Sequence, residues 1–433
     1  LVAEAPDYSA EGDPLSGRAS ASDTSRLVLL DAGGMLPRLF SLYNMKNDEV
    51  KVYLGFDAPG FLDNSAADYN EGLGDWLHYK SLWIEDWEIG EGVVTLYGYD
   101  QQVRFLESES PSRSPEDDRQ EQIHYNLLPP ALIKRDFLLR ARMRPSRIDF
   151  VAGPDGLPLP ETSFGALGEA SAWRLSRVIE KPAGLHSEDQ DLNRHLLAFQ
   201  AVDERGRWVA RRADFSASPV ARLSGDDILE KSERFQPGHR HLKNIAAVYY
   251  GGEGNSETDY RSLCLEVDEE GGKSYKEFSV DKLLSRFIPL SADPRDPGDI
   301  PVTVARARLR LQRHGLRSLD FSTRLEYAWL QIGDHVHVDS RRYRRPGAGS
   351  PNPLLVMLTR KSIDRGLGSV SWSALVLADA QEEELPGRSP AAPLSVTVEP
   401  NNDGTVTWSW QASPDDDGDR VLRYDLFRRL AHL

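Results

Sequence analysis

The sequence predicts a mainly β protein with a mixed α+β insertion between two small β domains. Three observations support this fold class. Short runs rich in β-branched and aromatic residues recur on both sides of a mixed middle region. Glycine, asparagine and aspartate end these runs, and closely spaced strands with short turns favour small barrels or sandwiches. Polar segments that contain proline separate the parts.

Length and composition allow more than one compact core. At 433 residues and 39% hydrophobic content, the chain has the material for roughly two to four domains. No run of about 18 apolar residues occurs, so we expect no membrane-spanning helix. The net charge of −16 argues against general affinity for nucleic acid, because phosphate binding needs a basic face. An acidic wall would instead let DNA pass without holding it.

The cysteine content and the N-terminal segment argue against a disulfide-bonded protein, a cysteine-based metal site and a signal peptide at the start of the chain. The single cysteine, Cys264, excludes an internal disulfide framework and any cysteine-based zinc or iron–sulfur site within one chain. We expect Cys264 to pack as a small hydrophobic strand residue, with a reactive thiol as the alternative. The N-terminus lacks an initiator methionine and the features of a signal peptide, which indicates a segment of a longer product.

The first β domain is expected at residues 26–110. Residues 1–25 are small and polar without apolar periodicity, and predict an extended arm or linker. Residues 107–120 carry two prolines and many charges, and so predict the loop that ends this domain. The expected strands are 26–30, 49–56, 81–87 and 92–99.

A mixed α+β region is expected at residues 111–299. Ser224 and Asp227 can cap a short helix that follows them, and glycines from Gly251 onward end a strand. The expected helices are 169–181, 228–235 and 274–287, and the expected strands are 196–202, 208–213 and 243–250.

The second β domain is expected at residues 300–381. In its first segment, 303–311, a period of two places Arg306, Arg308 and Arg310 on one side of a strand. A helix is the competing interpretation, since Ala, Arg and Leu all favour helices. Further strands are expected at 319–323, 334–339, 353–360 and 368–377.

A proline-rich linker, 382–393, leads to a third β segment at 394–433. Its expected strands are 394–398, 404–410 and 423–428. Trp408 or Trp410 in the second strand and Tyr424 in the third resemble the first half of a fibronectin type III module. We expect only part of such a β-sandwich here, because the chain ends before it closes.

Two segments resemble the β-barrels of the tail-hub proteins of bacteriophages, the tail-tip or baseplate-hub family. In the first, the strand before the Gly55-Phe56 turn precedes a glycine-centred hairpin and Asp100. In the second, the Gly333-Asp334 turn leads into a strand, and a hairpin follows. The resemblance implies two small β-barrel hub domains, separated by mixed domains and followed by a fibronectin III-like module.

The same resemblance implies a function without catalysis or cofactors. It predicts a structural virion protein at the tail tip, a homotrimeric hub that closes the tube, supports host attachment and lets DNA pass during ejection. Implied partners are other copies of the chain, distal tail and tape-measure proteins, a host cell-surface receptor and DNA in transit, with no stable nucleic-acid binding. The alternatives are a secreted carbohydrate-active protein with a fibronectin III module, and the hub of a contractile injection system or gene-transfer particle.

The motifs that suggest metal or catalytic chemistry are incomplete. His335 and His337 share one face of the expected strand, which is a chelating arrangement, but no third ligand is identifiable. We therefore favour solvent-facing histidines and predict no metal. The acidic loop at 413–419 places Tyr424 where a calcium loop needs glutamate. No phosphate-loop lysine follows Gly251, and no Gly-x-Ser-x-Gly motif occurs.

Arginine and lysine gather in three places despite the acidic total. One cluster runs from Lys134 to Arg147, and another is the set Arg306, Arg308 and Arg310. The third consists of Arg341, Arg342, Arg344 and Arg345. These side chains are candidates for subunit interfaces or for surfaces that face DNA, and the acidic whole favours interfaces.

Overall fold

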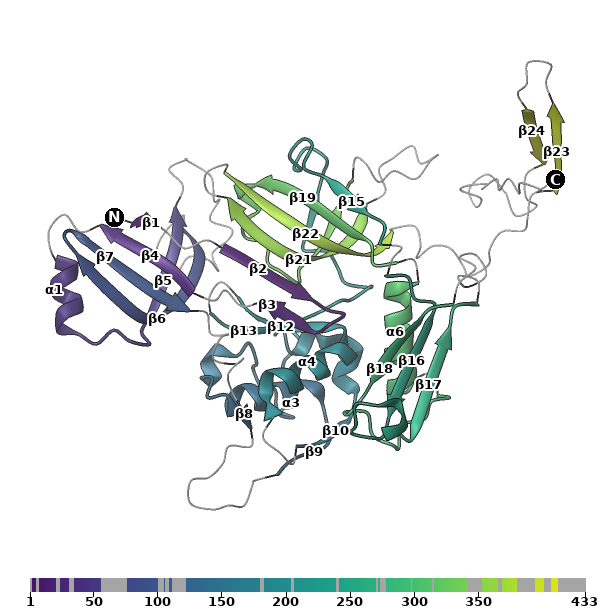
Figure 1. Ribbon diagram of the computed structural model, residues 1–433, viewed down its shortest axis with the longest axis horizontal. Coiled ribbons are helices and arrows are strands. Elements are labelled where there is room, and N and C mark those ends of the chain that lie inside the picture. Colours follow the sequence, from purple (N-terminus) through teal and green to yellow (C-terminus); the bar gives the residue numbers. More distant parts are fainter. Residues whose placement is uncertain are drawn as a thin grey trace.

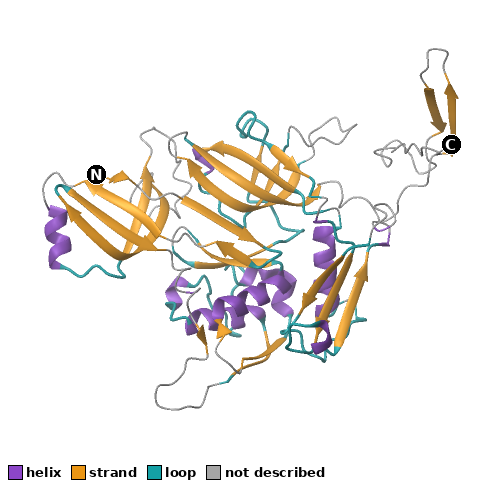
Figure 2. Ribbon diagram, viewed as in Figure 1, coloured by secondary structure: helices purple, strands orange, loops and turns teal. Residues whose placement is uncertain are grey.

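The computed structural model is mainly β, with helices concentrated in the middle of the chain (Figure 2). No described helix is long and apolar enough to cross a membrane. The structure describes residues 2–4, 8–20, 24–30, 35–55, 76–99, 105, 109–110, 122–179, 183–203, 206–238, 241–269, 272, 278–296, 298–313, 315–340, 353–364, 368–379, 394–400 and 406–411.

An antiparallel sheet of five strands forms the N-terminal part. In spatial order its strands are β1 (Val2–Glu4), β4 (Thr24–Leu30), β7 (Val93–Tyr99), β6 (Trp76–Gly90) and β5 (Glu49–Gly55). The helix α1 (Met35–Leu42) packs on it through Phe40, whose ring lies 6.1 Å from that of Trp87. The four strands expected here are confirmed. Within the described residues the sheet is open rather than a closed barrel, with β1 and β5 at its edges.

A larger, eight-stranded sheet forms the second β part. Its main path is β14 (Ala221–Leu223), β20 (His335–Val338), β21 (Leu354–Asp364), β22 (Ser369–Asp379), β19 (Ser318–Arg324) and β15 (Arg234–Gln236), and β2 (Tyr8–Asp13) and β3 (Arg18–Ser20) extend it. The short 3-10 helix η6 (Leu325–Tyr327) follows β19. The core of this sheet contains the buried side chains of Val336, Val356, Phe321 and Trp372. The strands expected between residues 319 and 377 are confirmed.

The N-terminal residues differ from the expected extended arm, because they form strands. β2 pairs antiparallel with β21, from Tyr8 opposite Ile363 to Glu11 opposite Arg360. β20 occupies the same edge of β21 at residues 354–357, so β2 continues that edge where β20 ends. Gly12 allows the close approach, since a Cβ there would lie 2.4 Å from the buried ring of Phe199. The partner that orders this segment is therefore the second β part of the same chain.

The middle region is mixed, as expected. Its helices are α3 (Pro130–Arg140), α4 (Leu185–Leu196), η2 (Pro145–Arg147) and η3 (Gly165–Ala172), and its strands are β8 (Glu109–Ser110), β9 (Ile123–Leu128), β10 (Leu175–Ile179), β11 (Ala183–Gly184), β12 (Ala198–Val202) and β13 (Trp208–Arg212). Phe137, Leu192 and Trp208 are fully or almost fully buried in its core. The β12–β13 hairpin confirms the predicted pair of strands.

A second mixed layer packs beside it. A sheet of β17 (Ser262–Val267), β16 (Ile245–Tyr250) and β18 (Val280–Leu284) has α6 (Ile300–Gln312) on one face, and η5 (Glu257–Asp259) lies between β16 and β17 (Figure 1). The strand at 245–250 and its end before Gly251 confirm the prediction. Cys264 is a buried strand residue of β17, as expected.

The strand predicted at 303–311 is wrong, because α6 occupies it. The Asp299 carboxylate caps the helix by accepting the Ile300 N–H at 2.6 Å, and Pro301 fits its first turn. Val304, Ala305 and Leu311 are buried, which gives the helical spacing that the alternating arginines obscured. α6 packs on β16 and β17, and thus belongs with the middle region.

All three helices predicted in the middle region differ in the structure. Residues 165–172 form the 3-10 helix η3, and β10 follows at 175–179. The Ser224 hydroxyl donates to the Asp227 carboxylate, yet the chain continues into β15 instead of the predicted helix. Residues 280–284 form β18, which lies parallel to β16. In each case strand pairing with a distant segment overrides local helix preference.

The C-terminal segment contributes an antiparallel hairpin. Its strands are β23 (Leu394–Pro400) and β24 (Val406–Gln411), with Val398 opposite Trp408. Two of the three expected strands are thereby confirmed. The third, at 423–428, lies outside the described residues, as does the acidic loop at 413–419.

Candidate functional site

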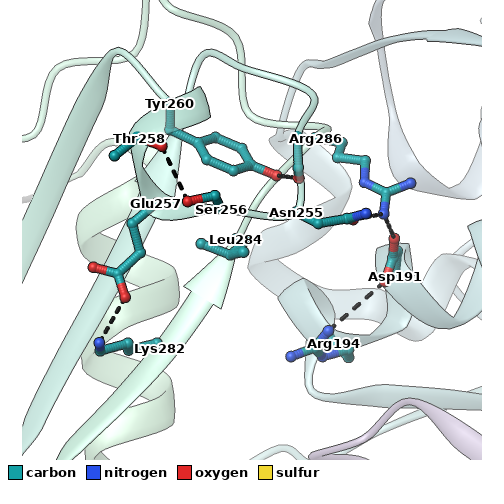
Figure 3. Close-up of a pocket in the computed structure, with 11 residues that line it drawn as sticks. Asp191, Arg194, Asn255, Ser256, Glu257, Thr258, Tyr260, Lys282, Leu284 and Arg286 are labelled. Carbon is teal, nitrogen blue, oxygen red and sulfur yellow. Dashed lines mark hydrogen bonds and ion pairs between the residues drawn. The ribbon is translucent and has the colours of Figure 1, made fainter.

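A charged cleft of about 660 Å³ lies between α4 and the sheet that contains β18 (Figure 3). α4 contributes Asp191 and Arg194, and Lys282 and Arg286 come from β18 and the turn after it. The loop between β16 and β17 supplies the remaining wall, including Glu257. The cleft therefore joins three segments that lie far apart in the sequence.

Ion pairs connect the walls of the cleft. Arg286 donates to the Asn255 side-chain oxygen at 3.2 Å and lies 3.7 Å from the Asp191 carboxylate. Arg194 lies 3.7 Å from the same carboxylate (Figure 3). Burial raises the pKa of Asp191, and the nearby Arg286 opposes that shift. These contacts hold the β16–β17 loop against α4.

A second acidic group anchors the network beneath the cleft. Glu188 is buried and accepts two hydrogen bonds from the Arg177 guanidinium, at 2.9 and 2.8 Å. Arg286 lies 3.8 Å from Glu188, so it faces two carboxylates at once. The two-pronged arginine contact fixes the orientation of Glu188.

The loop that forms the outer wall is ordered by its own hydrogen bonds. Gly251 has a φ of 73°, which lets the chain turn as β16 ends. Ser256 and Asp259 form a capping box around η5. Tyr260 donates to the Gly254 carbonyl at 2.8 Å. The sequence signal for a glycine turn is real, but it serves a loop and not a phosphate site.

The chemistry of the cleft is that of a charged contact surface. Lys282 pairs with Glu257 at 2.6 Å, and the arginines pair with Asp191, so both signs of charge are present and engaged with each other. The Ser256 hydroxyl lies 3.0 Å from that of Thr258 rather than beside a base. In the described part of the chain, no group of three or more His, Cys, Asp or Glu side chains could hold a metal ion.

The Gly333-Asp334 turn leads into β20, as the sequence predicts. Gly333 has a φ of 87°, and a Cβ there would lie 2.4 Å from the Arg211 side chain. Its N–H donates to the Leu358 carbonyl at 2.6 Å. Burial raises the pKa of Asp334, whose carboxylate accepts the Gln331 N–H at 2.8 Å. The turn thus fixes the start of β20 against β21.

The two histidines of the weak metal candidate lie on β20 with the spacing predicted. His335 is partly buried and accepts the Asp214 N–H at 3.1 Å, so one ring nitrogen is already engaged. Burial lowers the pKa of His335 to about 4. His337 is half-buried on the same face. We expected both histidines to face solvent, and for His335 this expectation is wrong because its ring is partly buried.

The arginines of α6 do not share a face. Arg308 is buried and bonds to Asp281 at 2.6 Å and to the Arg194 carbonyl at 2.9 Å. Arg306 and Arg310 are exposed: Arg306 donates to Glu266 at 3.2 Å, and the Arg310 guanidinium lies 4.5 Å from the centre of the Phe215 ring. A helical period separates the inward arginine from the outward pair.

Other predicted residues fall at the limits of the structure. Gly55 is the last residue of β5, one residue before the predicted end of that strand. Phe56, Asp100, Arg341, Arg342, Arg344 and Arg345 lie outside the described residues. Their predicted roles stay predictions.

Sequence reasoning missed the side chains of the cleft and misjudged Lys134. Lys134 belongs to a cluster expected at a surface, yet it is fully buried and bonded to Asp189 and Asn193. The helical spacing of Asp189 and Asn193 was the available signal, but α4 was not predicted. Nothing in the sequence pairs α4 with the β16–β17 loop, because their contact is purely tertiary.

No family model and no curated protein matches this chain. Solved structures that resemble it include a tail protein from Neisseria meningitidis MC58, with TM-score 0.48 and 12% identity over 86% of this chain and 92% of that one. The 43 kDa tail protein of prophage MuSo2 from Shewanella oneidensis has TM-score 0.42 and 12% identity, over 86% and 94%. An E. coli component of the type VI secretion system has TM-score 0.37 and 11% identity, over 93% and 84%.

The chain resembles phage tail proteins. By their descriptions, two of these structures are tail proteins and the third is a component of a secretion system. At such low identity the likeness concerns the fold and not the residues of any site.

Proposed function

We propose that this chain is a structural protein of a phage tail, in which three copies form the hub at the distal end of the tube. The observation that carries the proposal is the order of parts along the chain. A β sheet within residues 2–99 precedes a mixed region. A second sheet follows, whose four longer strands lie within residues 318–379 and which earlier segments complete, and a hairpin at 394–411 comes last. This is the order that the hub family implies. The domain boundaries at residues 110 and 381 are part of the proposal, whereas the boundary expected at residue 299 would separate α6 from the middle region on which it packs.

Contacts between the parts of the chain support a structural role. β2 joins the second sheet, so the N-terminal segment is held by a strand more than three hundred residues away. Arg147 in η2 forms an ion pair with Glu49 in β5, which links the middle region to the first sheet. These contacts connect the N-terminal segment and the first sheet to the rest of the chain, which supports a structural component.

The remaining features of the proposal concern partners. The hub would contact distal tail and tape-measure proteins on the tube side, and the fibronectin III-like segment would point toward a host receptor. The net charge of −16 supports a channel wall that DNA passes without binding. The function is structural and needs neither a cofactor nor a catalytic group.

The mass of the assembly tests the proposal. We expect the full chain to have three times its monomer mass of 48.5 kDa by light scattering at tens of micromolar, and to form rings in electron micrographs. Gold-labelled antibody should bind the tail tip of intact particles. A protein that stays monomeric at high concentration and forms no ring would overturn the trimeric hub.

The hub of a contractile injection machine or gene-transfer particle is the second candidate, because the same order of parts supports it. The particle from which the chain is recovered decides between the two. The secreted carbohydrate-active alternative makes a different prediction, namely polysaccharide cleavage that is lost when one carboxylate pair is mutated. Incubation with cell-surface polysaccharides and analysis of the released sugars tests it.

A further inference from the structure

One end of the molecule presents an apolar sheet face. Strand alternation places Leu263, Leu265 and Val267 of β17 on the side away from α6, where they are 39%, 56% and 46% exposed. Val280 of β18 and the nearby Phe278 are 37% and 58% exposed. In the described part of the chain β17 pairs only with β16, so it is an edge strand. An apolar face beside a free edge marks a place where another chain can dock.

A row of arginines borders this face. Arg306, Arg310 and Arg313 recur at helical spacing on α6, and with Val267 and Asp268 they line a groove of about 500 Å³. The Nε atom of Arg313 is buried without a hydrogen-bond partner among the described residues. Together the apolar face and this arginine row form what we call the sheet-end surface. Its groove is lined by three arginines and one acidic residue, Asp268, and because Arg306 also pairs with Glu266, a small surplus of positive charge remains.

A second apolar patch lies around α1. Met35, Leu42 and Tyr43 are 74%, 68% and 61% exposed. Leu30 and Ile89 are 43% and 45% exposed. Both lie beside the β6–β7 turn, because Leu30 and Gly90, the neighbour of Ile89, each lie opposite Val93. We call this patch and the adjoining hairpin tip the α1-end surface.

The hairpin tip gives the α1-end surface a negative charge. Residues 85–92 contain four acidic side chains and no basic one, and all four are exposed: Glu85, Asp86, Glu88 and Glu91. The hairpin tip of the α1-end surface is therefore acidic, although α1 itself carries the exposed Arg38, whereas the groove of the sheet-end surface is lined by arginines. Surfaces of opposite charge attract and orient one another on binding.

The two surfaces lie at opposite ends of the folded chain. In Figure 1, α1 is at the far left and β17 is on the right, with the mixed middle region between them. The complementary surfaces thus cannot meet within one copy, but they can meet between two copies. Such head-to-tail contacts close into rings when the rotation between copies allows it.

We propose that a second copy of this chain docks its α1-end surface onto the sheet-end surface of the first. This contact specifies the interface of the proposed hub, and its closure into a ring of three copies rests on that proposed function. The apolar residues supply buried area, and the acidic hairpin tip meets the arginine row.

Charge reversal tests the contact in the full chain. Glu85→Lys with Glu91→Lys, and separately Arg306→Glu with Arg310→Glu, place like charges across it. We expect each pair to weaken self-association at least about tenfold in sedimentation velocity, since like charges at an interface cost several kcal/mol. Combining all four substitutions in one chain restores opposite charges, and should return the dissociation constant to within about threefold of the wild type.

Matched controls separate this contact from a general effect of charge. Glu161→Lys with Glu230→Lys makes the same change in net charge at exposed sites outside both surfaces, and should leave association unchanged. Arg144→Glu with Arg234→Glu is the control for the arginine pair. Thermal melting of each variant reports whether its fold is retained.

Cross-linking gives a second readout that needs no variant. In a mixture of unlabelled and ¹⁵N-labelled wild-type chains, a lysine-reactive reagent should join Lys46, after α1, to Lys282 on the outer sheet face of another copy. Absence of that mixed cross-link in the assembly, full association of either reversed pair, or failure of the fourfold variant to recover overturns the contact but leaves a trimer standing. A wild type that never associates overturns the hub as well.

Discussion

A buried lysine holds the middle region together at the scale of single residues. The Lys134 ammonium donates to Asp189 and to the side-chain oxygen of Asn193, both at 2.6 Å. Asn193 in turn donates to the carbonyl of Gly17, in the turn between β2 and β3. Burial lowers the pKa of Lys134, and the Asp189 charge opposes that shift. One cluster therefore connects α3, α4 and the N-terminal strands.

The substitution Lys134→Met should lower the free energy of unfolding. Asp189 would remain buried with its charge uncompensated by lysine, so we expect a loss of about 3–5 kcal/mol in the free energy of unfolding. Lys134→Met with Asp189→Leu removes both charges and should recover much of that loss. Urea unfolding measures both variants. Equal losses in the single and double variants would show that the ion pair is not the cause.

His335 should make stability depend on pH. Its pKa falls from 6.5 to about 4 in the fold, mainly by burial, with Asp214 raising and Arg211 lowering it. The unfolded chain therefore binds a proton between pH 6.5 and 4 that the folded chain does not, and stability declines as pH falls through that window. The full difference is about 3 kcal/mol.

The variant His335→Gln isolates this contribution. Glutamine offers an oxygen to the Asp214 N–H but takes up no proton, so its unfolding free energy should fall less than that of the wild type between pH 7 and pH 4. Urea unfolding across that range gives the difference. Parallel curves for the two proteins would rule out His335 as the source.

At the scale of elements, the docking of β2 is the most consequential contact. β2 takes the edge of β21 that β20 leaves open, and Gly12 passes directly over Phe199. β3 then returns along β2, with Gly12 opposite Ala19. A short N-terminal segment thereby completes the second sheet.

Gly12→Val should release this segment. Its side chain would overlap the fully buried ring of Phe199, and overpacking of this kind costs about 1–3 kcal/mol. We expect faster amide hydrogen exchange across residues 8–13, with β22 unaffected. Gly90→Val is the matched control, because the nearest atom to its Cβ is 3.7 Å away. Unchanged exchange in the Gly12 variant would refute this role for the glycine.

At the scale of the whole molecule, an acidic chain carries a local basic groove. The net charge is −16, yet Arg306, Arg310 and Arg313 line one groove with Asp268, and Arg306 also pairs with Glu266 beside it. Arg308, which the sequence groups with them, is instead buried against Asp281. A small basic groove on an acidic chain fits an interface with another protein subunit better than a surface that binds DNA.

Duplex DNA should not bind at about 150 mM salt. A groove of three arginines releases few counterions, and the acidic remainder repels the phosphates. If DNA binds at low salt, the logarithm of the binding constant should fall with the logarithm of the salt concentration with a slope no steeper than about −3. About 0.9 counterions are released for each phosphate contacted, and the groove has three arginines. Fluorescence anisotropy with a labelled duplex measures it. Tight binding at 150 mM salt, lost in Arg306→Glu with Arg310→Glu, would assign these arginines to DNA.

The sequence by itself determined the β character of both flanking parts and most of their strands. Alternating apolar residues and Gly333 at its turn are local signals, and the strands around them formed where predicted. It also indicated Cys264 as a buried strand residue. Such features follow from neighbours in the chain, which the sequence records directly.

Tertiary structure decided what depends on distant partners. α6 is a helix because Val304 and Ala305 pack in the core that contains β16, β17 and β18, although its arginines alternate like those of a strand. Residues 280–284 are a strand because β16 lies beside them. Lys134 is buried because α4 brings Asp189 to it. Free energy from contacts across the fold exceeds the small local preferences, so these outcomes could not be predicted from local pattern alone.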